Sequence, residues 1–303
     1  METTFIGLGT MGRPMVANLV RAGVAEVSVH DADPAALAEV AAATGARPLA
    51  EAARAADSDV VILMLPDAGV VRAVLGDPAD PGSLAARLAP GALVVDMGSS
   101  APRSTAALAA ALRERDVGLV DAPVSGGPRK AATAELTIML GGADEDCARV
   151  EPLLLAMGGP PTRTGPVGSA HALKALNNLL SAIGLVGALE VLTVGKDFGL
   201  DPAVMLDVIN RSTGRNQSTE VKIGPQVLGG GFDVGFSLAL TVKDIGTALD
   251  LARAQGIDSP LAETCVRVCR EALDSLRGTE PDQSEVVRHL ERRSGVRLTP
   301  EPG

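Results

Sequence analysis

The chain has 303 residues, of which 46% are hydrophobic and 1% aromatic, and it contains no tryptophan and no tyrosine. At roughly 150 residues per domain, this length predicts about two domains, whose cores must be filled by aliphatic side chains. The absence of tyrosine excludes oxidoreductase chemistry in which a phenol donates the proton, and it excludes base stacking on Tyr or Trp. The net charge of -10 disfavours nucleic acid and anionic membranes as partners, because the field of the protein repels phosphate.

Cysteine usage and the N-terminus point to the cytoplasm. The three cysteines, Cys147, Cys265 and Cys269, contain no C-x-x-C pair, so we expect buried thiols in a reducing compartment. Strand-like residues begin at Thr3, without a basic region and a long apolar run before them. The apolar stretch 175–189 is shorter than the roughly 20 residues that a bilayer requires, which favours a core helix.

The first half of the chain alternates short apolar runs with alanine-rich segments, the pattern of βαβ units and a parallel sheet. The predicted strands cover residues 4–6, 26–30, 60–65, 93–97, 118–121 and 136–140. The predicted helices between them cover residues 11–21, 34–44, 68–75 and 103–113.

Beyond residue 165 the pattern becomes helical to the end of the chain. A long helix over 169–198 is predicted to link the two halves. Further helices are expected over 202–210, 216–226, 241–255, 260–276 and 283–294. These patterns predict an α/β domain over 1–165 and an all-α domain over 166–303.

A glycine-rich loop follows the first predicted strand and opens a helix. This G-x-G-x-x-G consists of Gly7, Leu8, Gly9, Thr10, Met11 and Gly12. Such glycines allow a tight turn and a close approach of pyrophosphate to the backbone, with the helix N-terminus facing the phosphates. The strand before the loop and the strand after its helix give the motif the required context. We therefore expect a Rossmann-type dinucleotide-binding domain.

Asp31 indicates which dinucleotide is preferred. It lies at the end of the second predicted strand, about 20 residues after Gly12, where an acidic residue accepts hydrogen bonds from the ribose hydroxyls. Its carboxylate would repel a 2′-phosphate, and no arginine lies in residues 30–33. NAD is therefore favoured over NADP.

A nicotinamide enzyme that oxidises an alcohol needs a group that accepts the hydroxyl proton. Tyrosine is absent, and the three histidines lack the spacing of metal ligands, so no metal site is predicted. Lys174 lies in an otherwise apolar helical segment, and Asn178, four residues later, shares its face. Desolvation among Ala and Leu would move the pKa of Lys174 toward the range of a general base, whereas a solvated helix lysine would be inert.

Four separated motifs resemble those of the β-hydroxyacid dehydrogenases, the family of 3-hydroxyisobutyrate dehydrogenase and 6-phosphogluconate dehydrogenase. They are GLGTMGRPM at 7–15, DAPVSGG at 121–127, GPVG at 165–168 followed by Lys174 and Asn178, and Lys243-Asp244. Together they span most of the chain. Members of this family are dimers or tetramers, so the resemblance also implies a homo-oligomer.

The resemblance implies a role for each matching residue. Lys174 is the general base in oxidation and the acid in reduction, and Asn178 holds the substrate hydroxyl or the lysine. The substrate carboxylate is bound by Ser125, Gly126 and Gly127. The cofactor is lined by Leu65, Pro66 and Ser99, and Lys243 approaches its nicotinamide end. Arg215 or Asn216 pairs with a second polar group of the substrate.

The chain also departs from the family pattern. Val70 stands where relatives have asparagine, and the segment 96–99 has Gly98 and Ser99 where serine and threonine are usual. Imine reductases share the architecture but generally lack a lysine at the position of Lys174, which argues against that activity.

The sequence thus predicts a cytoplasmic, NAD-dependent dehydrogenase that converts a small 3-hydroxy acid, such as 3-hydroxyisobutyrate, to its semialdehyde. Two alternatives stay open. One is an NADPH-dependent reductase of small aldehydes such as succinic semialdehyde or glyoxylate. The other is a non-catalytic regulatory protein that binds NAD.

Overall fold

The structure is a computed structural model that describes residues 1–300. The chain divides into two compact units, unit 1 over Met1–Lys174 and unit 2 over Ala175–Gly303. The predicted boundary, between residues 165 and 166, precedes helix α8 (Ser169–Asp197), whereas the structural boundary lies inside that helix. A change in the hydrophobic pattern marks where a helix begins. The boundary between compact units can instead lie inside a helix, when residues at its two ends belong to different units.

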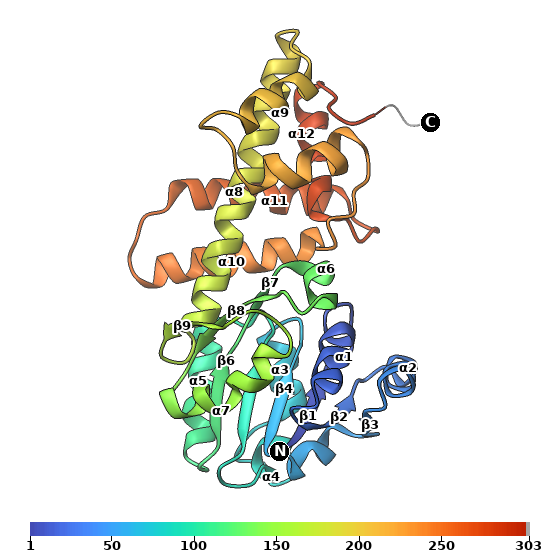
Figure 1. Cartoon of the computed structure of the whole chain (residues 1–303). Coiled ribbons are helices and arrows are strands. Elements are labelled where there is room, and N and C mark those ends of the chain that lie inside the picture. The colour runs from blue at the N-terminus through green and yellow to red at the C-terminus, as the bar shows by residue number, and fades with distance from the viewer. Residues whose placement is uncertain (301–303) are drawn as a thin grey trace. The chain divides into compact units, whose positions relative to one another are not determined.

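Unit 1 contains a sheet that is mostly parallel (Figure 1). Its strands are β1 (Glu2–Ile6), β2 (Glu26–His30), β3 (Arg47–Pro48), β4 (Val60–Leu63), β5 (Leu93–Asp96), β6 (Gly118–Asp121), β7 (Val124–Ser125), β8 (Thr137–Gly141) and β9 (Thr162–Gly165). Their order is β3-β2-β1-β4-β5-β6-β8-β7, with β9 paired to β8. The strands from β3 to β6 run parallel, whereas β8 is antiparallel to both β6 and β7.

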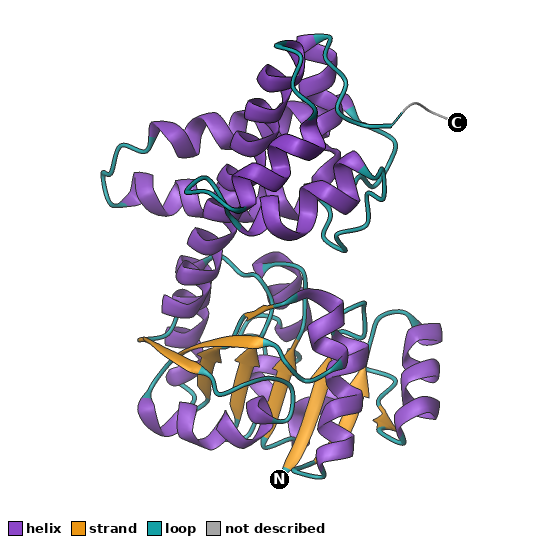
Figure 2. Ribbon diagram, turned by 45° about the horizontal axis from the view of Figure 1, so that its top comes forward, coloured by secondary structure: helices purple, strands orange, loops and turns teal. Residues whose placement is uncertain are grey.

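The helices of unit 1 cover both faces of this sheet (Figure 2). They are α1 (Gly12–Ala22), α2 (Pro34–Thr44), η1 (Ala52–Asp57), α3 (Ala68–Leu75), α4 (Leu84–Arg87), α5 (Pro102–Arg113), α6 (Gly127–Ala132) and α7 (Asp144–Leu155). Successive strand residues point to opposite faces: Val60 and Ile62 join the core with α1, α2 and α7, whereas Val61 and Leu63 join the core with α3, α4 and α5. Burial on both faces explains why the strands are continuous apolar runs.

The predicted strands and helices of unit 1 are confirmed to within two residues at their ends. The prediction missed the short strands β3, β7 and β9, the short helices η1, α4 and α6, and helix α7. Helix α7 begins with three acidic residues, Asp144, Glu145 and Asp146, which favour a helix N-terminus. It contains Pro152, which conceals the helix in a pattern search.

The described residues of unit 2 form helices joined by loops and contain no β-strand. After α8 come α9 (Pro202–Asn210), the π-helix η2 (Ser218–Leu228), α10 (Leu238–Ala254), α11 (Pro260–Ser275), the short η3 (Gln283–Glu285) and α12 (Val286–Ser294). Its core is aliphatic and includes Cys265 and Cys269, which are buried as expected. The fold class, a Rossmann-type α/β domain followed by a helical domain, is confirmed.

The segment predicted as an α-helix over 216–226 is a π-helix over Ser218–Leu228 instead. Pro225 lies inside it, and proline has no N–H to donate and clashes with the carbonyl four residues earlier in an α-helix. A wider turn relieves this clash, and the N–H of Gly229 donates to the oxygen of Gly224, five residues earlier, at 2.8 Å.

Helix α8 carries one face of the unit 2 core. It is long and apolar enough to cross a membrane by length and composition, with a mean hydropathy of 1.7, but core helices meet the same test. Leu185, Leu189 and Leu192 are buried in the core, as predicted for a core helix, whereas Leu180 and Val194 are 70% and 71% exposed. The helix therefore has one packed face and one exposed apolar face.

Lys222 of the π-helix is buried in unit 2. Its Nζ donates to Ser181 Oγ at 3.1 Å and to Gln283 Oε1 at 3.4 Å. Desolvation lowers the pKa of Lys222, although the charge of Asp282 opposes that shift. The folded state therefore favours the neutral amine more than the unfolded state does.

We expect this lysine to make stability depend on alkaline pH. Between its lowered pKa in the folded state and the unfolded value of about 10.4, the unfolded state holds more protons, so the free energy of unfolding rises with pH. Lys222→Met should remove part of this rise in urea denaturation from neutral to alkaline pH. Lys196→Met, which replaces an exposed lysine of α8, serves as the control and should keep the wild-type slope. Equal slopes for all three proteins would contradict the assignment.

Candidate active site

The glycine-rich loop has the conformation that a dinucleotide pyrophosphate requires. Gly7 has φ +103°, and a Cβ there would overlap the carbonyl oxygen of Met64. A Cβ on Gly12 would overlap the carbonyl oxygen of Gly7, so this glycine permits close packing of α1 against the loop. A Cβ on Gly9 meets no described atom within 4 Å. The backbone at Gly9 therefore borders open space, where phosphate can approach.

Asp31 lies at the end of β2, beside this loop. Its Oδ2 accepts a hydrogen bond from the N–H of Leu8 at 2.6 Å, and its Oδ1 accepts one from the N–H of Asp33 at 2.8 Å. The carboxylate thus fixes the glycine loop to the end of β2 and places a negative charge at that point. Each carboxylate oxygen has a second lone pair, which leaves acceptor capacity for ribose hydroxyls.

The other expected cofactor residues follow the neighbouring parallel strands. Leu65 and Pro66 lie two and three residues after the end of β4, and Ser99 lies three residues after the end of β5. A Cβ on Gly98 would overlap the carbonyl oxygen of Leu65, so the glycine lets these two segments approach closely. The structure therefore brings the glycine loop, Asp31 and both lining segments to the carboxyl edge of one parallel sheet, where open α/β sheets bind ligands.

The expected carboxylate-binding turn, Ser125 to Gly127, lies at the end of β7. Gly126 and Gly127 have φ +135° and +70°, in the region that favours glycine. Ser125 is half-buried and Gly126 is exposed. The turn leads into α6, which is held by a hydrogen bond from Asn18 Nδ2 of α1 to the oxygen of Ala131 at 2.7 Å. A turn of small residues suits the recognition of a carboxylate by hydroxyl and backbone N–H groups.

Lys174 lies half-buried on α8, and the start of this helix is fixed to the sheet by Asp121. Asp121 Oδ1 accepts from the N–H of Gly168 at 2.7 Å, and Oδ2 accepts from the N–H of His171 at 2.8 Å. Gly168 directly precedes α8 and His171 lies in its first turn, where backbone N–H groups have no intrahelical partners. Asp121 lies in the DAPVSGG motif, where the sequence alone does not indicate its partner.

Burial raises the pKa of Asp121, and the charge of His171 and the hydrogen bonds from His171 and Gly168 act in the opposite direction. A carboxylate with no exposed surface is retained here because it satisfies two helix donors at once. The glycine at position 141 leaves room for it, since a Cβ there would lie 2.6 Å from Asp121 Oδ1 and 2.7 Å from Ser169 Oγ.

In unit 2, Asn178 is held by Asp244. Its Nδ2 donates to Asp244 Oδ2 at 2.6 Å, and Asp244 Oδ1 lies 2.9 Å from the Nζ of Lys243. The structure thus joins Asn178 and Lys243, which lie 65 residues apart in sequence, through one carboxylate that is 1% exposed. The Lys243-Asp244 pair is a sequence motif, but only the hydrogen bond to Asn178 reveals that Asp244 holds this side chain.

Arg215 and Asn216 have local partners. Arg215 is exposed, with its Nη1 3.9 Å from Glu220 Oε1. Asn216 Oδ1 accepts from the N–H groups of Ser218 and Thr219 at 2.8 and 3.2 Å, which caps the π-helix. The side-chain oxygen of Asn216 therefore has a structural task in unit 2, independent of any substrate.

Comparison with known proteins places the chain. The family described as "NAD binding domain of 6-phosphogluconate dehydrogenase" matches residues 2–184. The family described as "NAD-binding of NADP-dependent 3-hydroxyisobutyrate dehydrogenase" matches residues 168–290. The chain belongs to the β-hydroxyacid dehydrogenase family.

Several β-hydroxyacid dehydrogenases are similar over nearly the whole chain. The 2-(hydroxymethyl)glutarate dehydrogenase of Eubacterium barkeri is 34% identical, covering 97% of this chain and 96% of the relative. The NAD-dependent L-serine dehydrogenase of Pseudomonas aeruginosa is 36% identical, covering 89% and 91%. A structure of Mycobacterium tuberculosis 3-hydroxyisobutyrate dehydrogenase with L-serine has a TM-score of 0.84 and 32% identity, covering 96% and 99%.

Membership of the β-hydroxyacid dehydrogenases confirms the resemblance carried by the four motifs. Family members are oxidoreductases that act on CH–OH groups with NAD(P). The chain is accordingly an oxidoreductase homologue with an NAD(P)-binding domain.

Proposed function

We propose that this protein is an NAD-dependent dehydrogenase that reversibly oxidises a small 3-hydroxy acid to its semialdehyde. The observation that carries the proposal is the placement of Lys174 on α8, one turn before Asn178 and one turn after His171, whose N–H donates to Asp121. This placement gives a half-buried amine on a helix whose start is anchored to the cofactor domain. An amine so held is suited to accept a proton from an alcohol.

The relatives support a substrate class. The names of the three relatives refer to 2-(hydroxymethyl)glutarate, L-serine and 3-hydroxyisobutyrate. Each of these compounds carries a CH₂OH group on the carbon that bears the carboxylate, so the class is a primary alcohol β to a carboxylate. The compounds differ only in the third substituent, and we expect the same frame in the substrate of this chain, with 3-hydroxyisobutyrate as the first candidate.

Each group at the sheet edge has a task in this reaction. The glycine loop and Asp31 would hold NAD, with Leu65, Pro66 and Ser99 along it; NAD supplies the hydride acceptor. Ser125 and the backbone N–H groups of Gly126 and Gly127 bind the substrate carboxylate and orient its hydroxyl.

Proton transfer falls to α8. Lys174 Nζ takes the hydroxyl proton during oxidation and returns it to the carbonyl oxygen during reduction, while Asn178 orients the hydroxyl. The roles that the resemblance implies for Arg215, Asn216 and Lys243 are part of the same proposal.

The preference for NAD rests on Asp31. The 2′-phosphate of NADP carries roughly two negative charges, and it would lie beside the Asp31 carboxylate, which already accepts two backbone hydrogen bonds. The two groups would repel each other. The test is a panel of C3 to C6 hydroxy acids assayed with NAD and with NADP, together with the corresponding aldehydes and NADH or NADPH. Turnover of a 3-hydroxy acid with NAD as the better cofactor is the expected result. Turnover of small aldehydes only with NADPH would favour the reductase, and NADH binding without any turnover would favour a regulatory NAD-binding protein.

Asp31→Ala should shift cofactor preference toward NADP. Removal of the carboxylate eliminates the repulsion of the 2′-phosphate and the acceptor for ribose hydroxyls, so the ratio of kcat/KM for NAD to that for NADP should fall about tenfold or more, equivalent to about 1.4 kcal/mol. Asp33→Ala is the matched control, since Asp33 caps α2 through the N–H of Ala35 and should not alter the ratio. An unchanged ratio in Asp31→Ala would remove the argument for NAD.

The location and assembly of the protein belong to the same proposal. We place it in the cytoplasm as a homodimer or homotetramer without nucleic acid or membrane partners. The exposed apolar side chains of α8, which include Leu180, Val194 and Phe198, support self-association, because exposed apolar surface of this kind marks interfaces.

A further inference from the structure

A cluster of buried polar side chains lies in unit 1, beside the residues that the proposed reaction uses. Its members are Asp96, Ser100, Thr105, Asp121 and His171, and each is at most 4% exposed. They come from the end of β5, the segment after it, α5, the end of β6 and the first turn of α8. Polar groups this deeply buried are costly unless they fix a specific arrangement.

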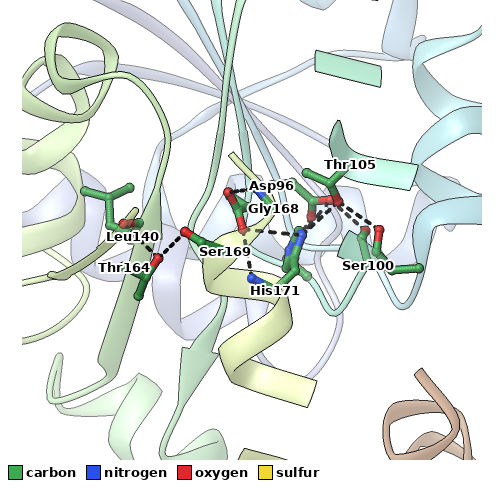
Figure 3. A network of polar contacts seen from close by, with 11 residues as sticks. Asp96, Ser100, Thr105, Leu140, Thr164, Gly168, Ser169 and His171 are labelled. Carbon is green, nitrogen blue, oxygen red and sulfur yellow. Dashed lines mark hydrogen bonds and ion pairs between the residues drawn. The ribbon is translucent and has the colours of Figure 1, made fainter. Parts of the chain in front are cut away.

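His171 lies at the centre of this cluster, as Figure 3 shows. Its N–H donates to Asp121, and its ring Nδ1 lies 2.9 Å from Thr105 Oγ1. The ring also lies between two carboxylates, with Nδ1 3.9 Å from Asp121 Oδ2 and Nε2 3.9 Å from Asp96 Oδ2. The ring is thus held by α5 through a hydrogen bond and lies within 3.9 Å of a carboxylate at each strand end.

Asp96 extends the cluster to the segment that is expected to line the cofactor. Its Oδ2 accepts from Ser100 Oγ at 2.6 Å, and its Oδ1 accepts from the N–H of Gly98 at 3.0 Å. Ser99 lies between these two donors. Asp96 therefore holds the residues on both sides of Ser99.

His171 precedes Lys174 by three residues on α8. A shift or rotation of the first turn of α8 is transmitted directly to Lys174, because the helix is continuous through both residues. His171 thus connects the helix that carries the proton acceptor to the segment that lines the cofactor.

We infer that His171 is a positioning residue that sets Lys174 relative to the cofactor-lining segment 96–100, acting through Thr105, Asp96 and Asp121. This inference rests on the proposed function. His171 takes no part in proton transfer itself: its side chain is fully buried and its role is to hold geometry. A displacement of a reacting group by about 1 Å can reduce a rate about 100-fold, so a small change here should be visible in kcat.

The test compares three substitutions in the full chain. His171→Leu removes both ring nitrogens, His171→Gln keeps a polar group that can reach Thr105, and Thr105→Val removes the hydroxyl partner. Thr193→Val is the matched control for Thr105, since both hydroxyls donate to the carbonyl four residues earlier but that of Thr193 has no histidine partner. His289→Leu is the control for loss of a buried histidine in unit 2. Steady-state kinetics with NAD, NADH binding and thermal melting are measured for each.

We expect His171→Leu to lower kcat about 10- to 100-fold while KM for NAD changes by less than about threefold, a split that general destabilisation does not produce. Thr105→Val should lower kcat less, His171→Gln should restore part of the loss, and the double variant His171→Leu/Thr105→Val should be no worse than His171→Leu alone, since both act through one contact. If His171→Leu proves too unstable to assay, Thr105→Val and His171→Gln give the same comparison.

The inference is overturned if His171→Leu and Thr105→Val keep the wild-type kcat, or lose no more than the two control variants. It is also overturned if their effects multiply in the double variant. In both cases Lys174→Ala distinguishes failure of this inference from failure of the proposed function. If the wild type is active and Lys174→Ala is inactive, the proposed function still holds. A wild type that turns over no hydroxy acid would refute the proposed function and this inference together.

Discussion

Lys174→Ala is expected to lower kcat for oxidation of the 3-hydroxy acid by about 10²- to 10⁴-fold, the range that a positioned general base contributes. The reason is that Leu173 and Ala175, which flank Lys174, cannot accept the hydroxyl proton, and the His171 side chain, one turn earlier on α8, is fully buried. NADH binding should stay within a factor of about three, because the glycine loop and Asp31 lie elsewhere on unit 1. The measurements are steady-state kinetics in both directions and a fluorescence titration with NADH.

Lys196→Ala provides the control for this substitution. Lys196 lies on the same helix, is exposed, and donates to the carbonyl oxygen of Arg297. It should retain wild-type kcat and KM. If Lys174→Ala retained the wild-type rate, Lys174 would not be the proton acceptor, and a covalent role for the amine would be ruled out with it.

Gly9→Ala and Gly12→Ala should separate cofactor binding from folding. A methyl group on Gly9 meets no described atom but occupies the space that the pyrophosphate needs, so NADH affinity should fall about tenfold or more while the free energy of unfolding changes by less than about 0.5 kcal/mol. A methyl group on Gly12 overlaps the carbonyl oxygen of Gly7, so unfolding should become easier by about 1–3 kcal/mol. Urea denaturation and NADH titration of both variants provide the two quantities.

Each glycine variant serves as the control for the other, since one should change NADH affinity and the other the free energy of unfolding. Loss of stability in Gly9→Ala, or unchanged stability in Gly12→Ala, would contradict the conformation of the loop. Equal NADH affinity in Gly9→Ala and the wild type would show that the backbone at Gly9 does not face the cofactor.

Long elements with a clear period were predictable. The strand over Glu26–His30 and the helices over Pro34–Thr44 and Pro202–Asn210 end where predicted, because apolar periodicity, an aspartate N-cap and a following proline are all local. The short strands β3 and β7 have two residues each, too few for any period. They exist only because neighbouring strands supply hydrogen-bond partners.

Two features of the fold that the sequence did not predict have a tertiary cause: the direction of β8 and the π-helix. The pattern of β8 is that of an ordinary strand, and its antiparallel direction is set by how the chain returns after β7. The π-helix over Ser218–Leu228 follows from Pro225 together with burial of Lys222 and Ile223, which a helical period cannot distinguish from an α-helix.

The candidate site shows the same division. The position of Gly7, Gly9, Gly12 and Asp31 at the edge of the sheet was predictable, because a G-x-G-x-x-G loop and its acidic partner have fixed spacing along one βαβ unit. Asp121 and Asp244 were not assigned roles, since each acts on a segment 47 or 66 residues away in sequence. Nothing in the local pattern of an aspartate tells which distant N–H group or amide it will meet.

The sequence by itself determined the class of protein: an aliphatic chain without tyrosine, a G-x-G-x-x-G loop after the first strand with an aspartate after the second, and a lysine and an asparagine on one face of a helix. These properties depend on residue type and on short spacings, which local geometry converts directly into structure. Only the tertiary structure decided what holds these residues in place. Asp121 fixes the first turn of α8, His171 joins that turn to Thr105 and Asp96, and Asp244 holds Asn178, because buried polar groups find their partners across the fold rather than along the chain.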